Sequence, residues 1–227
     1  MSARELPLRL HAGSVDLDGD LAVPDLVRGL VVFTHGSGSG RGSPRNRQVA
    51  GALNARGFAT LLFDLLTPQE REEDDRTARL RFDIGLLGDR LVEVVTWLRR
   101  SYAVARRPLG LFGASTGAAG ALVAAARRPG DVAAVVSRGG RPDLAGDELG
   151  RVRAPTLLVV GGRDVEVLTL NERSAARLAG PHQVEIVPGA GHLFAEPGAL
   201  DAVSGLAGDW FTRHLTGNGP RTSLGPA

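Results

Sequence analysis

Ser115 lies in the pentapeptide Gly113-Ala114-Ser115-Thr116-Gly117, which is the part of this sequence best suited to covalent chemistry. A short apolar run, 109–112, precedes it, and an alanine-rich segment with strong helical propensity follows it. G-x-S-x-G between a strand and a helix is typical of a tight turn that exposes the serine hydroxyl. Glycine is expected on each side because a Cβ atom there would collide with the adjoining strand and helix. We therefore predict that Ser115 is a nucleophile.

A serine nucleophile needs a base to accept its proton and a carboxylate to hold that base in the right tautomer. His192 and Asp164 follow Ser115 in the chain, each on a glycine-containing turn after a predicted strand. The carboxyl ends of parallel strands meet at one edge of a sheet, so these side chains should converge there. Asp143, after the preceding strand, is an alternative acid. We assign Asp164 because Gly161-Gly162 places it directly after its strand.

The negative charge that develops on a carbonyl oxygen during acyl transfer needs two backbone N–H donors. Thr116 supplies one expected donor, since it begins a helix whose dipole also favours negative charge. The loop 35–40, H-G-S-G-S-G, follows another predicted buried strand, and Ser37 is its expected donor.

Three further side chains are candidates for binding substrate: His35, Arg138 and Arg141. A guanidinium group can hold a carboxylate through two hydrogen bonds, so the arginines would favour anionic acyl groups. The alternative is that they are solvated or paired with Asp143 or Asp147.

The composition excludes several other chemistries. The chain of 227 residues has no Cys, and all 27 of its basic residues are Arg. It can therefore form no disulfide, thiolate nucleophile, P-loop or lysine Schiff base. No metal-ligand motif or G-x-G-x-x-G fingerprint occurs, so we expect no metal and no cofactor.

The charge pattern does not indicate a nucleic-acid partner. The isoelectric point of about 10.2 accompanies a net charge of only +2, because few groups titrate in mild base when Lys and Cys are absent. No apolar stretch is long enough for a membrane span, and residues 1–13 contain no signal-peptide core. We expect a cytoplasmic protein that binds neither nucleic acid nor membrane.

Strand-like and helix-like segments alternate from residue 29 onward, which predicts a mostly parallel sheet of about eight strands with helices on both faces. An antiparallel hairpin over 6–24, centred on Asp18-Gly19-Asp20, should lead into it. The expected strands are 29–34, 58–64, 109–112, 132–137, 155–160 and 184–187. The expected helices are 46–56, 83–100, 116–127, 171–179 and 200–215.

Residues 1–216 are expected to form one α/β domain, and 217–227 a flexible tail. The interval 138–154 lacks the apolar spacing of a long helix, so we predict no cap domain over the site. The charged run 70–76 is either a solvated segment or part of the rim of the site.

These residues resemble the α/β-hydrolase superfamily from about residue 6 to residue 215. The G-A-S-T-G-A elbow, the H-G-S-G-S-G loop and the segment 137–144, S-R-G-G-R-P-D-L, are similar to the dienelactone-hydrolase-like branch. Dienelactone hydrolase itself uses a cysteine where this chain has Ser115. Similar proteins are sometimes joined to phosphoribosyltransferase domains, and no such domain is expected here.

The resemblance implies a serine hydrolase acting on a small carboxylic ester or lactone through Ser115, His192 and Asp164. The alternatives are an acyltransferase or perhydrolase that uses the same triad, or a ligand-binding protein that keeps the fold without turnover.

Overall fold

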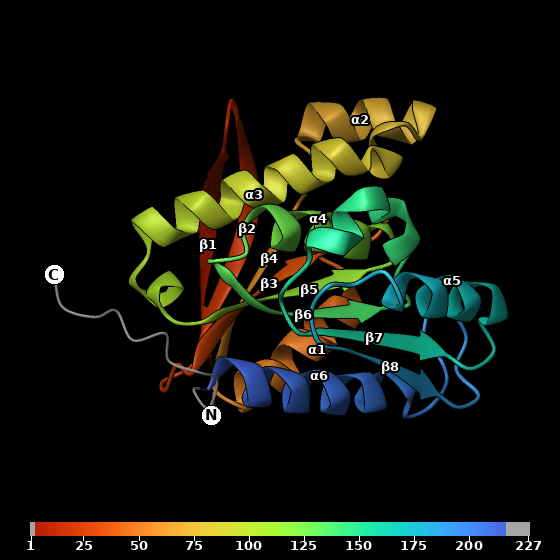
Figure 1. The fold of residues 1–227 in the computed structure, drawn as a ribbon. Coiled ribbons are helices and arrows are strands. Elements are labelled where there is room, and N and C mark those ends of the chain that lie inside the picture. The colour runs from red at the N-terminus through yellow and green to blue at the C-terminus, as the bar shows by residue number, and fades with distance from the viewer. Residues whose placement is uncertain (1–2, 217–227) are drawn as a thin grey trace, which may run out of the picture.

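One eight-stranded sheet runs through the middle of the molecule (Figure 1). The structure is a computed structural model and describes residues 3–216. The strand order is β1-β2-β4-β3-β5-β6-β7-β8, with β1–β2 and β2–β4 antiparallel and the other pairs parallel. The strands are β1 (Arg4–Ala12), β2 (Val15–Val23), β3 (Gly29–Thr34), β4 (Phe58–Phe63), β5 (Leu109–Ala114), β6 (Val132–Arg138), β7 (Thr156–Gly161) and β8 (His182–Val187).

Helices cover both faces of this sheet. On one face α1 (Pro44–Ala55) packs against α6 (Ala199–Leu215), and on the other α3 (Ile84–Ser101) packs against α4 (Thr116–Arg127). A segment of 3₁₀ turns, Pro142–Arg151, contacts both α4 and α5 (Val165–Ala175). The remaining helical segments are α2 (Pro68–Thr77) and the 3₁₀ turns Leu80–Phe82 and Ala103–Arg106.

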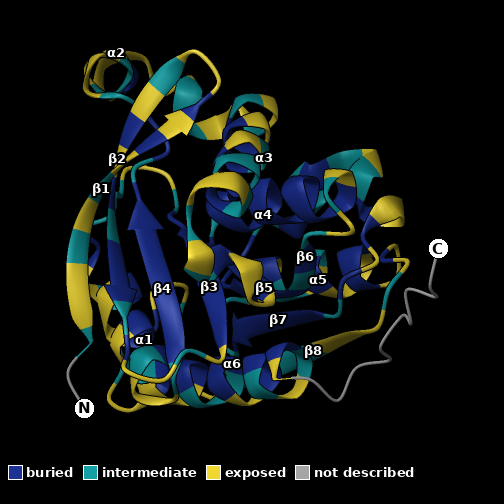
Figure 2. Ribbon diagram, turned by 90° about the vertical axis from the view of Figure 1, so that its left-hand side faces the viewer, coloured by how far each residue is buried: buried dark blue, intermediate teal, exposed yellow. Residues whose placement is uncertain are grey.

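The covered sheet explains the continuous apolar runs in the sequence. Every residue of β3, β4, β5 and β7 is buried (Figure 2). Apolar side chains therefore point to both faces and form two clusters, one beneath α3 and α4 and one beneath α1 and α6. The predicted mostly parallel sheet with helices on both faces is confirmed.

The N-terminal hairpin forms, but its turn is not at Asp18-Gly19-Asp20 as predicted. The chain turns between Ala12 and Val15, and Gly13 adopts a positive φ of 63° there. Gly19 stays inside β2, where a Cβ atom would lie 3.0 Å from Leu10 Cδ1. The small residue at position 19 thus serves sheet packing rather than a turn.

The helix after β7 begins earlier than predicted, whereas the absence of a long helix from 138–154 is confirmed. Helix α5 begins at Val165, directly after Asp164, rather than at Asn171. The interval 138–154 holds only the short turns Pro142–Arg151, interrupted at Gly146, whose φ is 57°. Within residues 3–216 no cap domain is inserted after β6.

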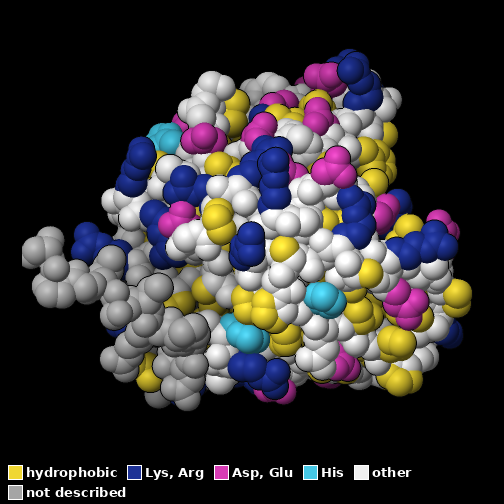
Figure 3. Space-filling model, viewed as in Figure 1, with side chains coloured by type: hydrophobic (Ala, Val, Ile, Leu, Met, Phe, Trp, Pro, Cys, Tyr) yellow, Lys and Arg dark blue, Asp and Glu magenta, His cyan; other side chains and the backbone are white. Residues whose placement is uncertain are grey.

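The expected C-terminal tail, 217–227, lies outside the described residues. None of the described helices is both long enough and apolar enough to cross a membrane. Basic and acidic side chains are interspersed over the face shown in Figure 3. The high isoelectric point therefore does not correspond to a basic patch on that face.

Candidate active site

Ser115 occupies a strained turn between β5 and α4. It is the one residue between Ala114, the end of the strand, and Thr116, the start of the helix, and its φ and ψ are 50° and −124°. A positive φ is unfavourable for a residue with a Cβ atom and costs about 1–3 kcal/mol. Two backbone hydrogen bonds, from Ser115 N–H to Arg138 O (3.3 Å) and from Arg141 N–H to Ser115 O (3.1 Å), hold the turn in place.

The flanking glycines are required by close backbone contacts, as predicted. A Cβ atom on Gly113 would lie 2.4 Å from Ala118 Cα. One on Gly117 would lie 2.4 Å from the carbonyl oxygen of His35. Strand, helix and the loop after β3 thus meet around Ser115 without space for a further methyl group.

His192 and Asp164 lie side by side, as expected from the ends of β8 and β7. His192 Nδ1 is 2.7 Å from Asp164 Oδ2. Because the carboxylate can only accept, Nδ1 donates, and Nε2 is left as the proton-accepting nitrogen. The side chain of His192 remains 40% exposed and lines the cavity that Ser115 lines, whereas that of Asp164 is only 16% exposed.

The alternative acid, Asp143, is engaged elsewhere. Its two carboxylate oxygens accept hydrogen bonds from Arg141 Nε (2.9 Å) and Nη2 (2.8 Å). This bidentate pair raises the pKa of Arg141 and occupies the fork that was expected to bind an anionic acyl group. The structure therefore places Asp164, and not Asp143, beside His192, and it corrects the expectation for Arg141.

Ser115 and His192 both line a cavity of about 220 Å³, here called the serine cavity. No hydrogen bond joins the Ser115 hydroxyl to His192 within residues 3–216. Other residues that line it are Ser37, Ser43, Arg45, Asn46, Arg138 and Leu193.

The two expected oxyanion donors are close together, but one of them is occupied. Thr116 N–H is the first amide of α4 and has no intrahelical acceptor. Ser37 N–H instead donates to the Thr116 hydroxyl at 3.0 Å. The Ser37 amide can bind an oxyanion only after the Thr116 side chain rotates away.

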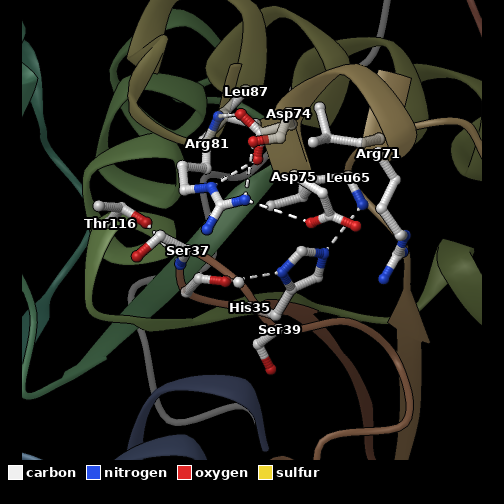
Figure 4. A pocket seen from close by; sticks show the side chains of 13 residues that line it. His35, Ser37, Ser39, Leu65, Arg71, Asp74, Asp75, Arg81, Leu87 and Thr116 are labelled. Atoms are coloured by element: carbon white, nitrogen blue, oxygen red, sulfur yellow. Dashed lines mark hydrogen bonds and ion pairs between the residues drawn. The ribbon is translucent and has the colours of Figure 1, made fainter. Parts of the chain in front are cut away.

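Both ring nitrogens of His35 form hydrogen bonds within the protein. Its Nε2 accepts a hydrogen bond from Leu65 N–H, and its Nδ1 donates to Gly36 O, both at 3.0 Å (Figure 4). Only 7% of the residue is exposed. The bond from Leu65 joins the loop after β3 to the loop after β4, and the bond to Gly36 lies within the loop after β3, so neither ring nitrogen is free for the substrate contact that was expected.

The neutral form of His35 should make protein stability depend on pH. Burial lowers its pKa below the usual value of about 6.5. Below that pH the unfolded chain binds more protons than the folded one, so the free energy of unfolding falls as the pH is lowered. We expect His35→Gln to cost about 1–2 kcal/mol at pH 7.5, and its stability to fall less than that of the wild type between pH 7.5 and 5.5.

Urea denaturation at both pH values measures this effect. His182→Gln, which changes an exposed imidazole, serves as the matched control and should keep the wild-type pH dependence. An unchanged pH dependence in His35→Gln would contradict the assignment.

Arg138 is a buried cation without a carboxylate partner. It is 7% exposed, and of its three nitrogens only Nη2 has a partner among the described residues, Asn46 Oδ1 at 3.4 Å. Burial and the nearby positive charge of Arg45 lower its pKa to about 10, so it remains charged at neutral pH.

Arg45 and Asn46 were missed by sequence reasoning. They lie in the first turn of α1, which starts with the pair Ser43-Pro44, a typical helix N-terminus. Because α1 follows a loop at the carboxyl edge of the sheet, this start signal could have indicated that its first turn reaches the site.

The charged run 70–76 lies in helix α2. We predicted either a solvated segment or part of the rim of the site, and this helix is both. Glu72, Glu73 and Asp75 are exposed. Arg71, Asp74 and Asp75 line a second cavity of about 210 Å³, which reaches Ser37 and Thr116 (Figure 4). Buried Asp74 is paired with Arg81 inside this cavity wall. Helix α2 therefore borders the oxyanion side of the site.

Comparison with known proteins agrees with this architecture. Residues 27–204 match the family described as "Alpha/beta hydrolase domain". The structure of dienelactone hydrolase from Anabaena variabilis is 52% identical, covering 95% of this chain and all of that one, with a TM-score of 0.93. The structure of Est1E from Butyrivibrio proteoclasticus is 15% identical over 91% of this chain and 98% of that one, with a TM-score of 0.76, and shares the fold.

Curated relatives from Mycobacterium tuberculosis carry a different name. Two proteins, from two strains, called "Putative phosphoribosyl transferase", are 57% identical over 217 residues, 96% of this chain. The match covers 48% of each relative, so the chain spans about half of their length.

Proposed function

The chain belongs to the α/β-hydrolase family and is similar to dienelactone hydrolase, and we propose that it is a serine hydrolase that cleaves a small carboxylic ester or lactone. The observation that carries this proposal is the hydrogen bond of 2.7 Å between His192 Nδ1 and Asp164 Oδ2, with His192 lining the same cavity as Ser115, which is half-buried on its strained turn. A nucleophile, a base and a group that orients the base are the parts that acyl transfer through serine requires.

The reaction proceeds in two halves. When substrate binds, His192 Nε2 accepts the Ser115 hydroxyl proton while Oγ bonds to the carbonyl carbon. The tetrahedral intermediate collapses, His192 returns the proton to the leaving oxygen, and an acyl-enzyme and an alcohol result. A water molecule then gives a proton to His192 while its oxygen attacks the ester carbon, and when this second intermediate collapses His192 returns the proton to Ser115 Oγ, which releases the carboxylic acid. Substrate binding must bring Ser115 and His192 within hydrogen-bonding distance, a tightening common between free and substrate-bound enzymes.

The developing oxyanion is stabilised by the Thr116 amide at the positive end of α4. Rotation of the Thr116 hydroxyl would add the Ser37 amide, which lies 3.0 Å from that hydroxyl. Asp164 keeps Nδ1 protonated and stabilises the imidazolium that forms in each half of the reaction.

Transfer to an acceptor other than water is the alternative that uses the same groups. The exposure of the His192 side chain supports hydrolysis, because water can reach the imidazole ring. We do not propose phosphoribosyl transfer for this chain, since that name belongs to proteins of which it spans 48%.

Short acyl groups should be preferred. The serine cavity measures about 220 Å³ and is lined mainly by polar residues. Each methylene of a longer chain that stays in water forgoes about 0.8 kcal/mol of transfer free energy. We expect kcat/KM for p-nitrophenyl esters to be highest between acetate and butyrate and to be no higher for decanoate.

A panel of p-nitrophenyl esters and simple lactones tests both the activity and this preference. Labelling with a fluorophosphonate probe tests the nucleophile without requiring the right substrate. Absence of both turnover and labelling at Ser115 would refute the proposed function. A rate that climbs steadily to decanoate would refute only the short-chain preference.

A further inference from the structure

The serine cavity contains two guanidinium groups that the proposed reaction does not use. Arg138 comes from the end of β6, and Arg45 from the first turn of α1; both line the cavity together with Ser115 and His192. Arg138 Nε and Nη1 and Arg45 Nε are buried without a hydrogen-bond partner among residues 3–216. A buried donor without a partner costs about 1–3 kcal/mol, and more when it is charged.

No counter-ion compensates these charges. The lining of the serine cavity includes no Asp or Glu, and neither arginine forms an ion pair with one among the described residues. The only hydrogen bond from the Arg138 guanidinium in the described structure is the long one of 3.4 Å to Asn46, and the face of the Phe194 ring lies 6.0 Å from its Cζ atom. Each guanidinium also repels the other. Two desolvated like charges are tolerated when an anion is bound between or beside them.

The helix that presents Arg45 adds to the positive potential. Ser43, Arg45 and Asn46 of the N-terminal turn of α1 line the cavity, and that turn contains no acidic residue. The amide dipoles at the start of a twelve-residue helix favour negative charge. The N-terminus of α1 and the two arginines thus make the electrostatic potential more positive in the same cavity, which Ser115 also lines.

We propose that the serine cavity binds an anionic group of the substrate, a carboxylate or a phosphate, through Arg45 and Arg138, and that the proposed hydrolase is selective for anionic esters or lactones. This inference rests on the proposed function for the identity of the scissile bond. The anion would accept hydrogen bonds from the unpartnered guanidinium nitrogens. It would also fix the position of the carbonyl carbon relative to Ser115, since both lie in one cavity.

Three esters with acyl chains of similar length test the proposal. They are p-nitrophenyl pentanoate, the mono-p-nitrophenyl ester of glutaric acid, and p-nitrophenyl 4-phosphonobutanoate. We expect kcat/KM of the wild type to be at least about tenfold higher for one anionic ester than for the neutral one, which corresponds to a single charged hydrogen bond. The better of the two anionic esters distinguishes a carboxylate site from a phosphate site.

The ratio of anionic to neutral kcat/KM should fall at least about tenfold in Arg45→Gln and in Arg138→Gln. Arg47→Gln is the matched control, because Arg47 lies on the same helix and its guanidinium is bonded at 2.7 Å to Asp20. Its ratio should stay at the wild-type value. If Arg138→Gln does not fold, Arg45→Gln decides, since Arg45 is only partly buried.

Equal kcat/KM for the charged and neutral esters, or a preference that survives Arg45→Gln, overturns the anion site while the hydrolase proposal stands. If none of the three esters is cleaved, titration of the protein with glutarate and with inorganic phosphate replaces the kinetic test. Weaker binding in Arg45→Gln than in Arg47→Gln then supports the anion site, and equal or absent binding overturns it.

Discussion

Replacing Ser115 by alanine is expected to abolish hydrolysis of every ester or lactone that the wild-type protein cleaves. Loss of the nucleophile in a serine triad costs about 10⁶-fold in kcat, because no other group can form the acyl-enzyme. The strained backbone should persist, since Ala114, Thr116 and the backbone hydrogen bonds that hold the turn are unchanged. Rates on the best ester of the panel and fluorophosphonate labelling followed by mass spectrometry measure the effect.

Ser14→Ala is the control for this experiment, since Ser14 lies in the exposed turn between β1 and β2. It should retain full activity and labelling. Labelling of the Ser115→Ala protein, or turnover close to that of the wild type, would show that another group is the nucleophile. Thermal denaturation of the variant, with a midpoint near that of the wild type, excludes unfolding as the cause of the loss.

Asp164→Asn should lower kcat by about 10⁴-fold if Asp164 orients His192. The amide can donate to the imidazole, which favours the tautomer that carries its proton on Nε2 and cannot accept one from Ser115. Asparagine is also a good N-terminal residue for α5, so stability should change little. A pH profile of kcat/KM for the wild type and variant records the loss.

Asp143→Asn is the matched control, because it changes the rival carboxylate in the same way. Asp143 is paired with Arg141 and away from His192, so we expect activity within a few-fold of the wild type. The reverse result, with a large loss in Asp143→Asn and a small one in Asp164→Asn, would move the acid to the end of β6.

Much of this protein could be predicted from local sequence patterns. The apolar runs that became β3, β4, β5 and β7 are buried on both faces, so their composition alone indicates a covered parallel sheet. The glycines on either side of Ser115 indicate a tight turn, because a Cβ atom at either position would collide with neighbouring backbone. Ser115, Asp164 and His192 follow strands β5, β7 and β8, so their order along the chain can be read directly from the sequence.

Tertiary structure alone decided how the side chains at that edge are paired. The sequence favoured Asp164 over Asp143 only through the Gly161-Gly162 turn, whereas the Arg141 fork on Asp143 and the position of His192 beside Asp164 appear only in the fold. The hydrogen bond that His35 Nε2 accepts comes from Leu65 N–H, 30 residues later in the chain. Arg138 lacks a carboxylate partner because the fold brings no Asp or Glu of the described residues beside it, and no local sequence pattern indicates this. Backbone conformation is set largely by near neighbours, whereas hydrogen bonds and ion pairs join residues that only the complete fold brings together.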